Sequence, residues 1–373
     1  AAAARWRVRR TDSVPQARPG QARQAGRNRR PRPAGGRFQA STGRAGLSIM
    51  ALPDGRRWRP LPSMPACESA MRKSADAFAF QTMLLLCVIW GIQQVTIKWA
   101  ATDIAPVMQA AIRSGIAAAL VGLLMCWRGG WEGLRQGTLG AGLLTGTLFA
   151  LEFLFIALGL QYTTASHMSV FLYTAPIFSA LGLHFLLPSE RLRPLQWLGV
   201  AVCFGGIAVA FGGGLSWAEM DGRMLLGDAF GLLAGMSWGA TTVAVRGTRL
   251  SEAPPSLTLF YQLFVACAGL LLIALFSGQF GEVRWTPVST ASVLFQGVVV
   301  SFASYFCWFW LLRRYQANNL AIFSFMTPLF GVTFGVLLLG EPLSLNFVAG
   351  AALVLAGITL VSGEQWLRRL LRR

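Results

Sequence analysis

The sequence predicts an all-α integral membrane protein of ten transmembrane helices, built as two inverted five-helix repeats. Three observations predict this fold. The 373 residues are 54% hydrophobic and only 13% charged, whereas a soluble domain carries roughly 25% charged residues. From Ala79 onward, apolar runs follow one another at the length of about 20 residues that crosses a ~30 Å hydrocarbon core. The sequence also repeats itself after about 150 residues.

The ten predicted spans are apolar on all sides and are separated by short breaks that carry turn or charge signals. They cover residues 79–98, 107–127, 138–160, 166–187, 195–213, 225–245, 257–277, 290–312, 317–339 and 344–362. The chain therefore divides into a basic N-terminal tail (1–78), a first repeat (79–213), a linker (214–224), a second repeat (225–362) and a basic C-terminal tail (363–373).

The N-terminal tail holds 17 of the 33 Lys and Arg residues and four acids, and it has no hydrophobic period. A segment of this composition buries too little surface to fold alone. It has three interpretations: a stretch translated ahead of a start at Met50, Met64 or Met71, an organellar transit peptide, or an arm that touches anionic lipid. Because most of the net positive charge lies in this tail, we expect no nucleic-acid partner.

The basic residues near the span ends predict the orientation. With a cytoplasmic N-terminus, the cytoplasmic side collects fourteen of them: Arg72, Lys73, Arg128, Arg135, Arg191, Arg193, Arg246, Arg249, Arg313, Arg314, Arg368, Arg369, Arg372 and Arg373. The opposite side collects three: Lys98, Arg223 and Arg284. This bias predicts a multi-pass protein of the inner cell membrane, in a lipid bilayer, with both termini cytoplasmic.

The internal repeat rests on matched Trp-Gly, Pro and Glu residues in the same order. Trp90-Gly91 falls on Trp238-Gly239, Pro106 on Pro255, Tyr162 on Tyr315, Pro176 on Pro328, Glu190 on Glu341, and Gly199 and Gly206 on Gly350 and Gly357. Five spans is an odd number, so the second copy is inverted relative to the first. Inverted repeats place a solute site near the bilayer midplane, where exchange of the two conformations gives alternating access.

These residues also carry a family resemblance. The stretch Gly159-Leu-Gln-Tyr-Thr-Thr-Ala-Ser, followed by Tyr173-Thr-Ala-Pro176, Glu190-Arg-Leu and Gly199, resembles the end of an EamA domain, and Thr327-Pro328, Gly340-Glu341-Pro-Leu and Gly350 resemble the same signature again. The resemblance covers about residues 79–362; it departs from the pattern at Pro188-Ser189, where a Gly commonly precedes the Glu. It implies the drug/metabolite transporter superfamily, a central cavity lined by both halves, and export of an amino acid or similar metabolite.

Glu152 and Arg113 are the leading candidates for binding or coupling, because an ionisable group inside a span costs several kcal/mol unless it is paired or hydrated. Glu152 is a candidate for a coupled proton or for a solute amine. Arg113 is a candidate for a solute carboxylate, which its planar fork binds in a bidentate manner. The alternative for both is a structural ion pair, and for Arg113 also a side chain that reaches the outer surface.

Other polar and aromatic residues in the spans are candidate cavity residues, with helix packing or hydrogen bonds to neighbouring helices as the alternative. They are Trp90, Gln93, Gln94, His167, Tyr173, Trp238, Thr241, Thr242, Gln262 and Tyr305. For His167 the choice is between a pH-responsive role and a hydrogen-bonded residue at a helix start. Pro176 and Pro328 each remove a backbone hydrogen bond within a span and are candidate hinges.

We expect no cofactor, metal site or catalytic group, because the cysteines lie mainly in apolar runs and no His-rich or Asp-rich motif occurs. The glycine faces of the fifth and tenth spans allow contact within one chain or in a homodimer. A secondary transporter of a small solute is the main hypothesis, and a proton is one candidate for the coupling ion. A membrane-embedded enzyme and a scaffold without transport are the alternatives.

Overall fold

A computed structural model describes residues 76–131, 134, 137–187, 191–211, 222–315, 320 and 323–362. Its regular elements are helices, and no β-strand occurs among these residues. Nearly all of the predicted N-terminal tail, most of the predicted linker, and the predicted C-terminal tail lie outside the described residues. The all-α membrane fold that the sequence predicts is confirmed.

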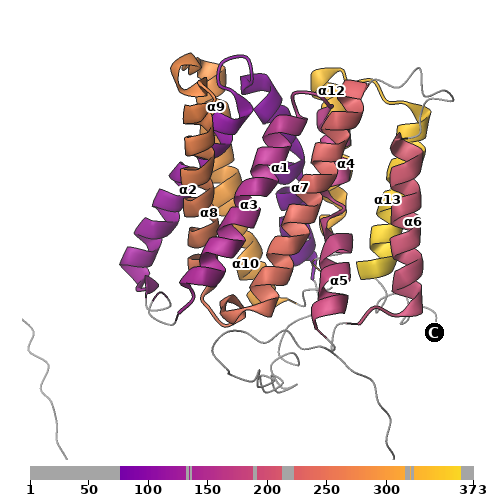
Figure 1. Ribbon diagram of the computed structural model, residues 1–373, viewed down its shortest axis with the longest axis horizontal. Coiled ribbons are helices and arrows are strands. Elements are labelled where there is room, and N and C mark those ends of the chain that lie inside the picture. The colour runs from indigo at the N-terminus through magenta and orange to yellow at the C-terminus, as the bar shows by residue number, and fades with distance from the viewer. Residues whose placement is uncertain are drawn as a thin grey trace, which may run out of the picture. The chain divides into compact units, whose positions relative to one another are not determined.

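The helices follow the predicted spans in order (Figure 1). The first half contains α1 (Ala77–Ala100), α2 (Pro106–Arg128), α3 (Leu139–Gly159), α4 (Ala165–Leu172), α5 (Ala175–Leu186) and α6 (Pro194–Phe211). The second half contains α7 (Gly222–Gly247), η4 (Arg249–Ser251), α8 (Pro255–Phe276), η5 (Gln279–Glu282), α9 (Pro287–Leu294), the π-helix η6 (Phe295–Ser304), α10 (Tyr305–Arg314), α12 (Met326–Leu339) and α13 (Leu345–Ser362).

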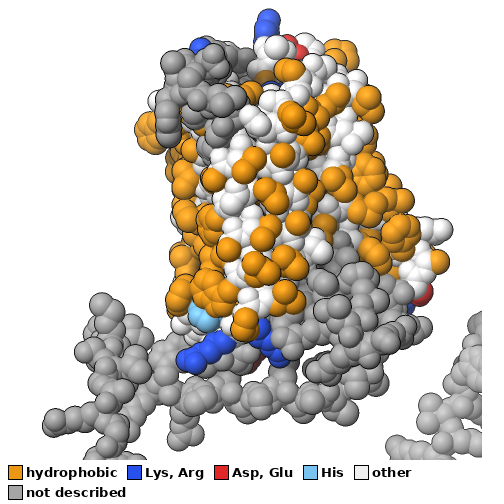
Figure 2. Space-filling model, turned by 90° about the vertical axis from the view of Figure 1, so that its right-hand side faces the viewer, with side chains coloured by type: hydrophobic (Ala, Val, Ile, Leu, Met, Phe, Trp, Pro, Cys, Tyr) orange, Lys and Arg blue, Asp and Glu red, His pale blue; other side chains and the backbone are white. Residues whose placement is uncertain are grey.

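Six helical stretches are long and apolar enough to cross a membrane: Ala77–Ala100, Pro106–Arg128, Leu139–Gly159, Ala165–Leu186, Pro255–Phe276 and Pro287–Leu311. Helix lies in each of the ten predicted ranges, although the number of ten crossings stays a prediction. Figure 2 shows hydrophobic side chains along the height of one face, with Lys and Arg side chains at its two ends. This distribution is what a bilayer requires of a protein surface.

Three predicted spans are interrupted in the structure. In the span predicted at 317–339, a turn at Phe325 precedes α12, which has Pro328 in its first turn. The span predicted at 166–187 breaks after Leu172, and α5 resumes at Ala175 with Pro176 in its first turn. Proline has no N–H to give the preceding turn, so the break lies just before it. The span predicted at 290–312 is α-helical only at its ends, because ten residues between α9 and α10 form a π-helix.

Helices from the two halves interleave. Two repeat-equivalent pairs are in contact, namely α2 with α8 and α6 with α13, and α4 of the fourth predicted span contacts α12 of the ninth. The contact of α1 with α12 has its counterpart in the contact of α7 with α5. This is the pattern expected when two copies of one unit are related by a two-fold axis, and it places residues of both halves at the centre of the bundle.

Gly199, Gly206, Gly350 and Gly357 let α6 and α13 meet backbone to backbone, and the two helices stand side by side at the right of Figure 1. A Cβ on Gly206 would lie 2.7 Å from both Gly350 O and Val354 N. Gly205, the neighbour of Gly206 in the sequence, faces open space: an added Cβ would meet no atom within 4 Å. The glycine faces are thus used within one chain, and a homodimer stays a prediction.

We expect Gly206→Ala to lower the free energy of unfolding by about 1–3 kcal/mol, because the added methyl group forces the two backbones apart. Thermal unfolding of the purified protein in detergent measures this change. Gly205→Ala is the matched control, since the added Cβ there meets no atom within 4 Å. Equal melting temperatures for the two variants would show that the backbone contact does not hold α6 to α13.

Candidate functional site

Arg113 and Glu152 lie at the same depth in the bundle. Arg113 is seven residues into α2, and Glu152 is seven residues before the end of α3. Because α2 begins and α3 ends at the same end of the bundle, both residues lie ~10 Å from that end at 1.5 Å per residue. Their exposed fractions are 1% and 5%. We call this end the Lys98 end, after the residue in the last turn of α1.

The two charged groups interact through space and are not bonded to each other. Arg113 interacts electrostatically with both Glu152 and Tyr305, and its guanidinium carbon lies 3.6 Å above the ring of Phe153. Three buried atoms of this pair have no hydrogen-bond partner among the described residues: both Nη atoms of Arg113 and Oε2 of Glu152. Buried polar groups are nearly always hydrogen-bonded, so these atoms are exceptions that a functional role would explain.

Tyr305 brings the second half of the chain to this pair. It is the first residue of α10, directly after the π-helix, and it interacts electrostatically with Arg113 and Glu152. Its repeat position matches that of Glu152. A cation, a carboxyl group and a phenol from α2, α3 and α10 therefore converge near the centre of the bundle.

Two aromatic contacts flank this centre, and each joins the two halves. Trp90 Nε1 donates to Ser304 Oγ at 2.8 Å, and its ring packs edge-on against Trp308. Tyr173, at the break between α4 and α5, packs edge-on against Trp238 with ring centroids 5.5 Å apart. These four rings combine apolar faces with hydrogen-bonding edges.

The remaining predicted polar residues fall into three groups. Gln93 and Gln94 are buried on α1, and Gln94 Oε1 has no partner among the described residues. Thr241 and Thr242 donate to carbonyls one turn earlier in α7, Ser237 O and Trp238 O, so both serve their own helix here. Gln262 is half-buried on α8.

The π-helix carries a buried polar network that the sequence did not reveal. Gln296 Nε2 donates to Gln109 Oε1 and to Ser292 Oγ, each at 3.0 Å. Ser292 in turn donates to Thr96 O at 2.6 Å. Gln296 Oε1 and Ser301 Oγ lack partners among the described residues. Single-turn π-bulges occur frequently at functional sites, and this longer π-helix leads directly to Tyr305.

Asp228 was missed as a candidate, although it falls within a predicted span. It is 2% exposed on α7 and accepts from Thr163 Oγ1. Its Oδ2 lies 2.9 Å from His167 Nδ1. The His167 ring stacks on Phe347 of α13 at 3.8 Å. The structure thus places His167 in the first turn of α4, paired with a carboxylate of the other half and apart from the Arg113–Glu152 pair.

Glu341 is a second missed carboxylate and also binds the start of α4. Its side chain accepts from Ala165 N at 2.7 Å, Ser166 N at 2.9 Å and Ser166 Oγ at 2.7 Å. Lys98 Nζ donates to it at 3.3 Å. Burial alone raises the pKa of the Glu341 carboxyl, but the bonds from Ser166 and Ala165 and the charge of Lys98 outweigh burial and bring the pKa below its ordinary value.

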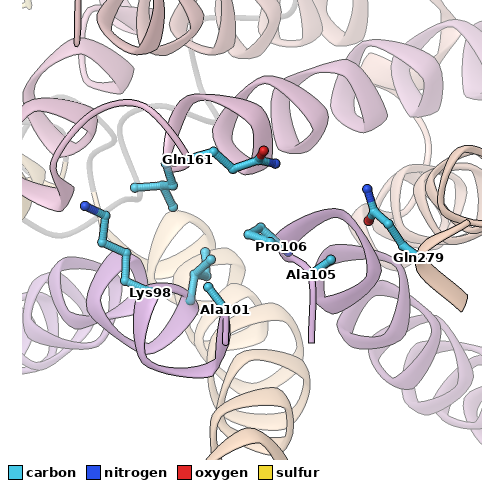
Figure 3. Close-up of a pocket in the computed structure, with 8 residues that line it drawn as sticks. Lys98, Ala101, Ala105, Pro106, Gln161 and Gln279 are labelled. Atoms are coloured by element: carbon cyan, nitrogen blue, oxygen red, sulfur yellow. The ribbon is translucent and has the colours of Figure 1, made fainter. Parts of the chain in front are cut away.

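A cavity of about 340 Å³ opens at the Lys98 end (Figure 3). The end of α1, the start of α2, the end of α3 and η5 form it. Its lining residues are Ile97, Lys98, Ala101, Ala105, Pro106, Leu160, Gln161 and Gln279. Among the described residues, no group of three His, Cys, Asp or Glu side chains is placed to hold a metal ion.

Comparison with known proteins agrees with this architecture. A family model described as the EamA-like transporter family matches residues 77–212 and 225–363. An uncharacterised transporter of Bacillus subtilis is 24% identical over 74% of this chain and 94% of its own length. A Salmonella typhimurium protein named "probable amino-acid metabolite efflux pump" is 26% identical over 74% of this chain and 91% of its own.

One solved crystal structure aligns with a TM-score of 0.55 and 19% identity, over 79% of this chain and 99% of the other. A likeness at this identity supports the fold alone. The family model, in contrast, matches well over half of the residues, in two segments. The chain belongs to the EamA-like transporter family.

Proposed function

We propose that this protein is a secondary transporter that exports a small metabolite, an amino acid or a similar compound, by alternating access. The observation that carries the proposal is the buried Arg113–Glu152 pair, in which both Nη atoms and Oε2 lack hydrogen-bond partners among the described residues. A zwitterionic solute satisfies both groups, with its carboxylate on the guanidinium and its ammonium on the carboxyl group. The name of the Salmonella typhimurium relative supports an amino-acid metabolite as the solute.

The charge pattern supports the orientation in which the Lys98 end faces away from the cytoplasm and both termini face it, in the inner membrane. Alternating access is supported by the contacts between repeat-equivalent helices, and by the helix breaks before Pro176 and Pro328, which we propose as hinges. The membrane-embedded enzyme and the scaffold are the alternatives. Transporters are not enzymes, and family membership favours transport over both.

Flux into liposomes tests the proposal. Purified protein is reconstituted with a panel of radiolabelled amino acids and related metabolites, under a pH gradient or a sodium gradient, with protein-free liposomes as the blank. We expect saturable flux of at least one solute. A known transporter reconstituted in the same way serves as the positive control. If that control is active and this protein gives no flux under any gradient, secondary transport is contradicted.

We further propose that Glu152 carries the coupled proton. Glu152→Gln should then lose flux driven by a pH gradient, because the amide cannot release a proton. Solute exchange at equal pH on both sides should continue at a higher KM, because the amide oxygen still accepts a hydrogen bond from the solute ammonium. Exchange moves the loaded carrier in both directions without net proton movement. If the variant and the wild type respond to the pH gradient equally, the coupled proton binds elsewhere.

A further inference from the structure

Lys98 is chemically unusual in this chain. The sequence contains 33 Lys and Arg residues, of which only Lys73 and Lys98 are lysines. The side chain of Lys98 is 25% exposed, in the last turn of α1, and it lines the cavity at the Lys98 end. An ammonium group is a compact charge with three donors on a flexible stem, so it changes partners more readily than a guanidinium fork.

The bond between Lys98 and Glu341 is the most replaceable one that Glu341 makes. It measures 3.3 Å, whereas the three bonds to Ala165 and Ser166 measure 2.7–2.9 Å. Without Lys98, the Glu341 carboxylate still accepts those three hydrogen bonds. Lys98 can therefore leave Glu341 without stranding a buried charge, which would otherwise cost several kcal/mol.

The polar atoms around the cavity suit a solute that carries a carboxylate together with a hydrogen-bond donor. Lys98 supplies the cation. Gln279 Oε1 is buried and has no partner among the described residues. Gln161 donates from its Nε2 to Ala157 O at 3.3 Å, which leaves its amide oxygen available as an acceptor. Figure 3 shows these three side chains around the opening, with Ala101, Ala105 and Pro106 between them.

The cavity also lies on the same helices as the central pair. Leu160 and Pro106 line it. Glu152 is eight residues from Leu160 along α3, and Arg113 is seven residues from Pro106 along α2. These separations correspond to ~12 Å and ~10 Å along the helices. The cavity and the central pair are thus connected along α2 and α3, with the cavity nearer the end of the bundle.

We propose that this cavity is a second solute site, for a small carboxylate-bearing metabolite, and that Lys98 exchanges Glu341 for the solute carboxylate. The role of this second site, which is to hold the solute between the central pair and the outer solution, rests on the proposed transport function. The binding itself does not require transport. The ion pair with Glu341 returns Lys98 to its resting position when the solute leaves.

Reactivity of Lys98 tests the proposal directly. A Lys73→Arg variant leaves Lys98 as the only lysine, so an amine-acylating reagent followed by peptide mass spectrometry reads Lys98 alone. The probes are L-lactate and N,N-dimethylglycine, which have no acylatable amine, each compared with its carboxamide. We expect the carboxylates to slow acylation about tenfold at ten times their Kd, and the carboxamides to leave the rate unchanged.

Two variants in the Lys73→Arg background sharpen the result. Glu341→Gln should raise the basal acylation rate of Lys98 several-fold, because it removes the carboxylate that holds the ammonium group. Gln279→Leu should weaken protection by the carboxylates while leaving the basal rate unchanged. Equal acylation with each acid and its amide overturns the second site. Flux in liposomes without such protection would overturn this inference and leave the transport function standing.

Discussion

Arg113→Met is expected to lower solute flux about 100-fold, the largest effect on transport of the substitutions considered. Truncating one partner of a buried charged hydrogen bond costs about 2–5 kcal/mol, and 3 kcal/mol corresponds to about 100-fold in affinity. The measurement is initial flux in liposomes at a solute concentration below the wild-type KM. Arg128→Met is the matched control, since Arg128 is an exposed residue on the same helix.

The double variant Arg113→Met/Glu152→Gln separates the two interpretations of the pair. If the charges only hold the fold together, removing one strands the other, and removing both restores stability and flux together. If they bind solute, the double variant melts near the wild-type temperature and still transports nothing. We expect the second result, because no direct bond joins the two groups. Restored flux in the double variant would assign the pair a structural role.

Arg113→Lys adds a geometric test. Lysine keeps the positive charge but loses the planar fork that binds a carboxylate through two parallel hydrogen bonds. It also loses the flat surface that lies on the ring of Phe153. The flux of this variant should be intermediate between that of the wild type and that of Arg113→Met. The reduction should come mainly from a higher KM.

The fold was predictable because a bilayer imposes a simple rule on composition. Apolar runs, the charge bias and the repeated Trp90-Gly91 and Trp238-Gly239 pairs indicated membrane helices in two related halves. The π-helix at Phe295–Ser304 was not predictable. Its wider turns are stabilised by contacts with other helices, such as the bond from Gln296 to Gln109, and no local sequence period marks them.

The candidate site was predictable only in part. Depth in the membrane singled out Arg113 and Glu152 correctly as buried charges. Asp228 lies in the sixth predicted span, so the same rule would have identified it as well. Glu341 and Lys98 lie at helix ends, where charges are ordinary, so their pairing across 243 residues required the structure. Which polar residues face one another depends on helix rotation, and hydropathy does not report rotation.

Asp228→Ala is expected to lower the free energy of unfolding by about 3–5 kcal/mol, the largest effect on stability of any change considered. The side chain is 2% exposed and is the acceptor for Thr163 Oγ1 and the partner of His167 Nδ1. Truncation leaves both groups buried without this partner, and it opens a void beside His167. Thermal unfolding in detergent, followed by tryptophan fluorescence, measures the loss.

Asp228→Asn is the control that isolates the hydrogen bonds from the packing. The amide keeps the shape and one acceptor oxygen, so the loss should be near 1 kcal/mol, the net value of one hydrogen bond. Equal losses for the Ala and Asn variants would mean that the negative charge, and not the acceptor, holds α4 to α7. Since Glu341 binds the same turn of α4 from the other side, through Ala165 and Ser166, carboxylates of the second half hold this helix start twice. The hydrogen-bonded start of α4 thus contrasts with the centre of the bundle, where both Nη atoms of Arg113 and Oε2 of Glu152 have no partner among the described residues.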